Sequence, residues 1–275
     1  MRIVIITSSL QGTAATCIPP LAEHPDIEIA LVIYSRGEIV NRARARRRKL
    51  KKLWKIGLLG ALNGLRIRPW FTAGVARKLG PTSVTELAAR YGFRLEETPR
   101  VNCARTIELM REANADLGVS LGNGYLGSKV FSAPKYGMIN SHGEILPQFQ
   151  GAQSVIWQLY EGQAETGYTI HQIDRHIDTG PILYQEKIPL ELQPTLRETV
   201  SHNCARIREA ASKGLPYVVS HYPELAAQSR PQSGGRTYTT PSFWQFLRIW
   251  WQHRKLYRQS LAATANRNLS HSDNP

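Results

Sequence analysis

The chain has 275 residues, of which 42% are hydrophobic and 20% charged, a composition that excludes a disordered or membrane-embedded protein. That length suffices for one large domain, or for one domain with an appendage. The net charge of +14 is concentrated in two segments, because residues 36–55 carry +9 and residues 241–275 carry +4. The rest of the chain is therefore nearly neutral.

The start of the chain predicts a βαβ unit. A β-branched run at residues 2–7 predicts a strand, a helix is expected at 13–23, and residues 27–34 predict a second buried strand. Strand, helix and strand at this spacing indicate a parallel sheet with helices on its faces. The basic segment at 36–55 then interrupts the alternation.

The alternation resumes after the basic segment. Helices are expected at 81–91 and 103–113, and strands at 94–97 and 117–121. The Gly122-Asn123-Gly124 stretch follows the last of these strands as a loop. Because ligands of open α/β sheets bind outside the carboxyl ends of the strands, this loop is a candidate pocket wall.

The second half predicts further strands and helices, then a polar linker and a helical tail. The expected elements are strands at 137–141, 166–173 and 182–190, helices at 152–161 and 196–213, and an extended linker at 228–240. The predicted fold is a Rossmann-like α/β core with a mostly parallel sheet. We expect a catalytic domain at 1–215 with a basic helical insertion at 36–75, followed by a linker and a basic aromatic tail at 216–275.

The cysteines and the apolar runs indicate the cell compartment. Cys17, Cys103 and Cys204 are odd in number and lack metal-ligand spacing, which argues against a disulfide scaffold or a zinc site. The first residues resemble a core strand and lack the features of a signal peptide. No uncharged apolar run approaches the ~18 residues of a membrane span. These features predict a cytoplasmic protein.

Three side chains carry the chemistry that the sequence predicts. Asn140 and His142 are two apart on a predicted strand, so they project from the same face. A histidine, with a usual pKa near 6.5, can remove a proton from an attacking amine, and an amide can stabilise an oxyanion. Asp178 can orient the imidazole. Each residue alone is more typical of a structural role, and only the combination indicates acyl transfer to an amine.

The order of these residues resembles the folate-dependent formyltransferase family. The matching elements are Asn140, His142, Ile145-Leu146-Pro147, Gly151, Thr166-Gly167-Tyr168-Thr169 and Asp178-Thr179-Gly180. The resemblance is best over residues 117–190, looser over 1–35, and absent in 36–75 and beyond 240. It implies a transferase with a formyltransferase core.

The resemblance also implies a formyl donor and its binding site. The donor would be N10-formyltetrahydrofolate, with Asn140, His142 and Asp178 as the catalytic residues. In such enzymes the pterin ring lies against two backbone loops. Carried onto this chain, the loop residues are Asn123, Gly124, Tyr125, Leu126, Gly127, Asp174, Arg175, His176 and Ile177. Glycine suits such loops because the backbone itself must approach a flat ring.

Glu144 departs from the family pattern, which usually has serine or another small residue there. A carboxylate at this position could steer a cationic amine substrate toward the site. It could equally be a solvated loop residue. The sequence leaves both interpretations open.

The acceptor amine is predicted by exclusion. The turn after the first strand contains only Gly12, whereas the purine-pathway members bind phosphate with a glycine-rich turn. The residues after the matched segment look helical, aromatic and basic rather than like the β-barrel of the initiator-tRNA enzymes. The remaining branch resembles the sugar N-formyltransferases. It predicts a nucleotide-linked aminosugar as acceptor, for surface polysaccharide biosynthesis.

The basic segments favour other partners as well. The tRNA enzymes have a basic loop where residues 36–55 stand, so a tRNA-linked amine is the alternative acceptor. The segments 36–65 and 241–258 combine basic residues with Trp54, Trp244 and other apolar residues, a pattern typical of contact with an anionic membrane. Packing on the core or a homodimer interface explains the pattern equally well. A third interpretation is a non-catalytic basic module that binds membrane or nucleic acid.

Overall fold

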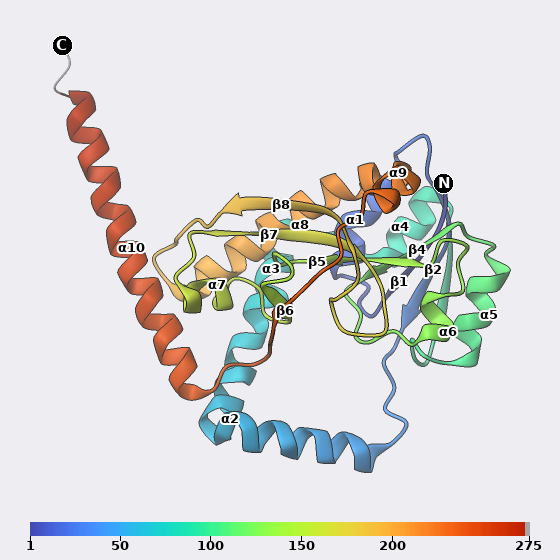
Figure 1. The fold of residues 1–275 in the computed structure, drawn as a ribbon, viewed down its shortest axis with the longest axis horizontal. Coiled ribbons are helices and arrows are strands. Elements are labelled where there is room, and N and C mark those ends of the chain that lie inside the picture. The colour runs from blue at the N-terminus through green and yellow to red at the C-terminus, as the bar shows by residue number, and fades with distance from the viewer. Residues whose placement is uncertain (273–275) are drawn as a thin grey trace.

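A computed structural model describes the backbone of residues 1–272 and the side chains of residues 1–263. Its centre is a seven-stranded sheet with the strand order β3-β2-β1-β4-β5-β7-β8 (Figure 1). The strands are β1 (Arg2–Thr7), β2 (Glu28–Ser35), β3 (Arg94–Thr98), β4 (Leu117–Leu121), β5 (Met138–His142), β7 (Glu165–Gln172) and β8 (Ile182–Pro189). The first five run parallel, and β7 and β8 are antiparallel to their neighbours. The predicted mostly parallel Rossmann-like sheet is therefore confirmed.

Helices cover both faces of this sheet. They are α1 (Thr13–Ala22), α3 (Ala73–Leu79), α4 (Val84–Tyr91), α5 (Ala104–Glu112), α6 (Ser128–Phe131), α7 (Ile156–Glu161), α8 (Leu196–Ser220) and α9 (Tyr222–Ala227). One apolar core joins α1, α4 and α8 to one face through residues such as Ile3 and Ile5. A second core joins α5 and α6 to the opposite face through Val4 and Ile6. This alternation follows from the period of two along a strand.

The carboxyl ends of β1 and β4 are tied together by one side chain. The amide nitrogen Nδ2 of Asn123 donates to the carbonyl of Ile6 at 2.6 Å and to Oγ of Ser120 at 3.1 Å. Its Oδ1 accepts a hydrogen bond from Ser8. Asn123 thereby fixes the loop after β4 at the edge of the sheet where parallel strands end.

The predicted helix at 152–161 and the predicted linker at 228–240 differ from the structure. The helix α7 begins only at Ile156, because Gln153 and Val155 have positive φ angles that a right-handed helix excludes. Residues just before it form the short strand β6 (Phe149–Gly151), which pairs in parallel with β9 (Arg236–Tyr238) from within the linker. A second, two-stranded sheet therefore connects the end of the chain to the centre of the molecule.

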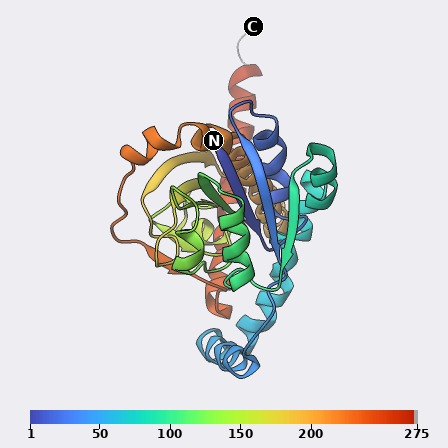
Figure 2. The ribbon, with the colours of Figure 1, turned by 90° about the vertical axis from the view of Figure 1, so that its right-hand side faces the viewer.

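The first half of the basic helix α2 (Arg42–Phe71) stands off the sheet core along the lower edge of the molecule, and the second half rises into the body (Figures 1 and 2). Gly57, with φ +74°, breaks it into two halves, and the second half packs through Gly60, Asn63 and Ile67. The C-terminal helix α10 (Phe243–Ser272) docks near its start and extends away from the body (Figure 1). Among residues 1–272, no helix is both long and apolar enough to cross a bilayer.

Candidate functional site

A cavity of about 1150 Å³ opens at the carboxyl ends of β4 and β5. Its walls come from the loop after β4, the end of β5, the loop after β7, strand β9 and helix α2. The α2 residues in its wall are Lys49, Lys52, Leu53, Ile56, Ala61, Gly64, Leu65 and Arg68. The predicted pocket wall at Gly122-Asn123-Gly124 lines the same cavity. The core and the basic insertion therefore enclose it together.

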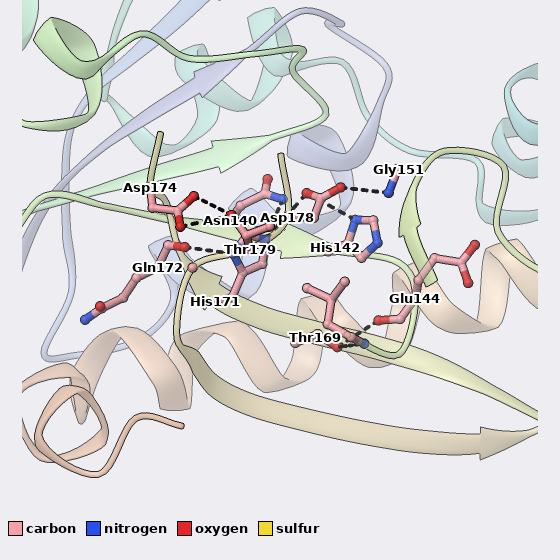
Figure 3. Close-up of polar contacts among 12 residues, drawn as sticks. Asn140, His142, Glu144, Gly151, Thr169, His171, Gln172, Asp174, Asp178 and Thr179 are labelled. Carbon is pink, nitrogen blue, oxygen red and sulfur yellow. Dashed lines mark hydrogen bonds and ion pairs between the residues drawn. The ribbon is translucent and has the colours of Figure 1, made fainter. Parts of the chain in front are cut away.

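Asn140, His142 and Asp178 meet in this cavity (Figure 3). Asn140 and His142 lie on one face of β5, as their spacing predicts, and Asp178 approaches from the loop after β7. Nδ1 of His142 lies 3.7 Å from Oδ1 of Asp178. The structure thus brings Asp178 to Asn140 and His142, from which it is 38 and 36 residues away in sequence.

The hydrogen bonds of His142 fix its neutral tautomer. Its Nε2 lies 2.9 Å from the carbonyl oxygen of Phe149. Because a carbonyl can only accept, Nε2 carries the hydrogen and Nδ1 holds the free electron pair. The basic nitrogen of His142 is therefore the one that lies next to Asp178.

His171 is a fourth member of the cluster that the sequence prediction missed. It is buried on β7 directly opposite Asn140, and its Nε2 lies 3.7 Å from Oδ1 of Asp178. Its Nδ1 donates to the carbonyl of Gln172 at 2.8 Å, so Nε2 accepts the amide hydrogen of Asn140 at 3.3 Å. His171 therefore orients the Asn140 amide. The sequence feature that could have identified His171 is its position two residues after Thr169, which places both side chains on the same face of a predicted strand.

Asp178 is held by its backbone and by a neighbouring amide. Its φ of +56° lies in the left-handed region, which Asp tolerates better than most residues, and Gly151 donates its N–H to Oδ2 at 2.9 Å. Burial alone would raise the pKa of Asp178. His171 and His142 stabilise the carboxylate when they are protonated, and the Gly151 amide does so as well. Together they outweigh burial, and the pKa of Asp178 lies below its usual value. Asp178 is therefore a fixed anion.

Burial lowers the pKa of His142, and the charge of Asp178 opposes this shift only in part. The imidazole is therefore neutral at physiological pH. A neutral imidazole beside a carboxylate can accept a proton and is then stabilised as a cation. The cluster can act as a general base next to an amide donor.

The loop before Asp178 has a shape set by Asp174. The carboxylate of Asp174 accepts from the backbone N–H of His176 at 2.9 Å and from Oγ1 of Thr179 at 2.8 Å. Gly180 ends the loop, where a Cβ would overlap the carbonyl of Gln172. The loop is therefore one defined turn rather than an open coil.

Most of the predicted donor-binding residues line the cavity. Those that do are Asn123, Gly124, Tyr125, Leu126, Asp174, His176 and Ile177. Gly127 and Arg175 do not. The amide of Gly127 donates to Oδ1 of Asn102 at 2.6 Å, and the side chain of Arg175 is exposed. Gly127 serves to close the loop after β4.

Glu144 fits neither interpretation drawn from the sequence. Its side chain is 3% exposed, so it is not a solvated loop residue, and it does not line the main cavity. It points away from the His142 cluster and accepts a hydrogen bond from Nε2 of Gln158 (Figure 3). Burial raises its pKa to about 8. Glu144 is a core residue, which the polar loop around it did not indicate.

A smaller cavity of about 350 Å³ continues from the main one. The two share Arg68, Ser141, Gly143, Ala152 and Gln153. Its far wall contains the half-buried Arg208 of α8, together with Thr13 and Cys204. Within residues 1–263, whose side chains are described, no carboxylate pairs with Arg208. The two arginines thus make this cavity cationic.

Known proteins that are similar in sequence to this chain fall into one family. Residues 71–219, more than half of the chain, match the family described as formyl transferase. The methionyl-tRNA formyltransferase of Thermosynechococcus vestitus is 30% identical over 180 residues, which cover 65% of this chain and 53% of that protein. The same enzyme of Trichodesmium erythraeum is 38% identical over 121 residues, or 43% and 36% of the two chains. The chain thus spans about half the length, or less, of these curated relatives.

Solved structures show the same fold. Glycinamide ribonucleotide transformylase 1 from Symbiobacterium toebii superposes with a TM-score of 0.55 at 16% identity, covering 85% of this chain and 94% of that one. The protein belongs to the formyl transferase family. The formyl donor of this family is N10-formyltetrahydrofolate.

Proposed function

We propose that this protein transfers the formyl group of N10-formyltetrahydrofolate to the primary amine of a nucleotide-linked aminosugar, for surface polysaccharide biosynthesis. The observation that carries the reaction is the meeting of Asn140, His142 and Asp178 in one cavity, with the basic nitrogen of His142 beside the carboxylate. A general base and an oxyanion donor are what formyl transfer to an amine requires.

The roles of the three residues follow from their contacts. The neutral amine attacks the formyl carbon, and the carbonyl oxygen becomes negative as the new C–N bond forms. Asn140 donates its second amide hydrogen to that oxygen, since the first is bound to His171. Nδ1 of His142 takes the proton that the nitrogen loses, and Asp178 stabilises the resulting imidazolium. When the bond to N10 of the folate breaks, that nitrogen takes up a proton, and the products are a formamide and tetrahydrofolate.

The two loops beside the cluster suit the folate donor. The main cavity lies between the loop after β4, around Gly124, and the loop from Asp174 to Asp178. Gly124 faces open space, and a Cβ there would meet no atom within 4 Å. A flat pterin ring is recognised through backbone N–H and carbonyl groups, which such irregular loops expose. We therefore propose Asn123, Gly124, Tyr125, Leu126, Asp174, His176 and Ile177 as donor-binding residues.

The smaller cavity supports an anionic acceptor. Arg208 and Arg68 face it, and a guanidinium left without a carboxylate partner pairs well with phosphate oxygens. A nucleotide-linked sugar carries two phosphates beside its sugar, so its amine can lie at His142 while a phosphate lies at these arginines. Lys49 and Lys52, in the wall of the main cavity, add positive charge at the entrance.

An aminoacyl-tRNA is the second candidate acceptor. The curated relatives described above are methionyl-tRNA formyltransferases, and the α2 segment carries eleven basic and no acidic side chains. Such a segment binds nucleic acid through phosphate neutralisation. A cytoplasmic location and a catalytic domain at 1–215 remain predictions that go with either acceptor.

A panel of acceptors distinguishes the two candidates. The purified chain is incubated with N10-formyltetrahydrofolate and, separately, with nucleotide-linked aminosugars, the free aminosugars and charged initiator tRNA. Products are identified by mass spectrometry. We expect a formamide with at least one nucleotide-linked aminosugar and little with the corresponding free sugar. Formylation of tRNA without any sugar product would overturn the proposed acceptor, and no product with any amine would overturn the reaction.

A further inference from the structure

The outward side of helix α2 carries a cationic surface without partners. The helix has eleven Arg and Lys residues, and within the part of the chain whose side chains are described none of them forms an ion pair. In its first half, Lys49, Lys52, Leu53 and Ile56 recur at helical spacing and face the main cavity. Arg47, Lys51 and Trp54 therefore lie on the opposite side, and all three are exposed.

Large apolar side chains lie among these charges. Trp54 is 87% exposed, and Leu58, Leu62 and Leu65 are 67%, 55% and 68% exposed. The three leucines follow one another at intervals of four and three residues, which places them on one side of the second half of α2. We call Arg47, Lys51, Trp54, Leu58 and Leu62 the α2 outer face. These residues lie on both sides of the break at Gly57, and a solvated helix gains nothing from exposing a tryptophan and several leucines.

The start of α10 packs against the buried side of the second half of α2, at Gly60, and exposes aromatic residues of its own. A Cβ at Gly60 of α2 would lie 3.2 Å from the Cα of Ser242, so α10 begins against the middle of α2. The exposed apolar residues of α10 are Trp244, Leu247, Trp250, Trp251 and Leu261. The guanidinium of Arg254 lies 4.7 Å from the ring centre of Trp250. Tryptophans beside basic side chains are typical of elements that lie at the surface of a bilayer.

We propose that the α2 outer face docks on an anionic phospholipid bilayer. Charge complementarity selects an anionic partner, because residues 36–55 alone carry +9. The apolar row selects a bilayer over a nucleic acid, since lipid chains bury leucine side chains whereas a phosphate backbone does not. The inference is independent of which amine is formylated.

Docking has a consequence for the catalytic cavity. Leu65 and Arg68 belong to the cavity wall, and Leu58 and Leu62 lie on the same helix half, beside them. A bilayer in contact with the leucines would lie next to the mouth of the cavity. The reaction would then take place at the membrane surface without any spanning helix.

Vesicle sedimentation tests the proposal with the full-length protein. Binding is measured to vesicles of phosphatidylcholine alone and to vesicles that also contain phosphatidylglycerol. We expect binding only to the anionic vesicles. The variant Trp54→Ser/Leu58→Ser/Leu62→Ser keeps every charge and should bind at least tenfold more weakly. Removing two charges with Arg47→Gln/Lys51→Gln should weaken binding by about 25-fold, roughly fivefold for each charge.

Matched controls separate docking from general charge and from unfolding. Arg77→Gln/Lys78→Gln removes two exposed charges from α3, outside the α2 outer face, and should lower binding by less than Arg47→Gln/Lys51→Gln does. Thermal unfolding followed by circular dichroism checks that each variant folds, and none of the substituted residues lines a cavity. If Arg77→Gln/Lys78→Gln and Arg47→Gln/Lys51→Gln weakened vesicle binding equally, the proposal would be overturned.

Two further outcomes assign the surface to another partner. Strong binding to RNA that the leucine and tryptophan substitutions leave unchanged, with no binding to anionic vesicles, would overturn the proposal in favour of nucleic acid. A dimer in analytical ultracentrifugation that the same substitutions dissociate, again without vesicle binding, would assign the face to a second copy of the chain. Vesicle binding is measured without any acceptor, so its failure would leave the proposed reaction intact.

Discussion

The proposed catalytic cluster and helix α2 hold their side chains in opposite ways. His142 and His171 are buried and bind backbone carbonyls, and Asp178 binds the amide of Gly151. On α2, the cations have no ion-pair partner among residues 1–263, and Trp54 faces solvent. Groups fixed by several partners suit one reaction geometry, whereas groups without partners remain free for another molecule. The difference agrees with the two proposals, in which the core carries out the reaction and the basic helix docks on a membrane.

The largest expected effect is that of His142→Ala. Loss of the general base should lower kcat by roughly 10²- to 10⁴-fold and leave vesicle binding unchanged. Steady-state kinetics with the best acceptor of the panel measures kcat, and vesicle sedimentation measures membrane binding. His221→Ala removes an exposed histidine at the end of α8 and should keep full activity. A His142→Ala protein that folds and keeps its rate would contradict the assigned base.

Asn140→Ala removes the proposed oxyanion donor. Its kcat should fall by roughly 10²- to 10³-fold, with little change in the KM of the folate donor, because the interaction strengthens only as the oxyanion forms. A matching variant, His171→Ala, leaves the Asn140 amide without its partner and should cost less than Asn140→Ala. If His171→Ala cost more, Asn140 would not be the principal donor.

Asp178→Asn changes both the rate and its pH dependence. The pKa of His142 is already below its usual value because of burial, and the charge of Asp178 raises it. Without that charge the pKa falls further. We expect the acidic limb of kcat/KM against pH to lie below pH 6.5 in the wild type and to move to lower pH in the variant, with kcat about 10- to 1000-fold lower. Asparagine also tolerates the positive φ at this position. A limb that moves to higher pH would contradict the pairing.

Arg208→Met tests the anionic acceptor site. A charge-assisted hydrogen bond contributes about 1.5–3 kcal/mol, so the KM for a phosphate-bearing acceptor should rise by roughly 10- to 150-fold while the KM for the folate donor stays constant. Arg206→Met, on the same helix but paired with Glu191 outside both cavities, is the matched control. Equal effects of the two variants would remove the support for a phosphate at Arg208.

Glu144→Gln should alter stability rather than catalysis. The folded protein keeps the carboxyl protonated up to a pKa of about 8, whereas the usual value is 4.5. Between these pH values the folded state holds one more proton than the unfolded state, so stability falls as pH rises, by roughly 5 kcal/mol at most. Glutamine keeps the contact with Gln158 and should remove this decline. Denaturant unfolding at pH 5 and pH 8.5 measures the free energy of unfolding of both proteins. A decline in Glu144→Gln equal to that of the wild type would contradict the protonation of Glu144 in the folded state.

The sheet, and the place of Asn140 and His142 on one face of a strand, can be predicted from the sequence because their signals are local. The apolar run Ile3–Ile6 indicates a buried strand, and Asn140 and His142 show the spacing of one strand face. The β6–β9 pair could not be predicted, because three-residue strands 85 residues apart are defined only by their contact. The burial of Glu144 is likewise a tertiary property, decided by Gln158 fourteen residues away.

The most direct test measures formyl transfer in solution and binding to anionic vesicles on the same two variants. His142→Ala should lose transfer and keep vesicle binding. Trp54→Ser/Leu58→Ser/Leu62→Ser should keep transfer in solution and lose vesicle binding. If either folded variant lost both properties, the division between a catalytic core and a docking helix would be contradicted.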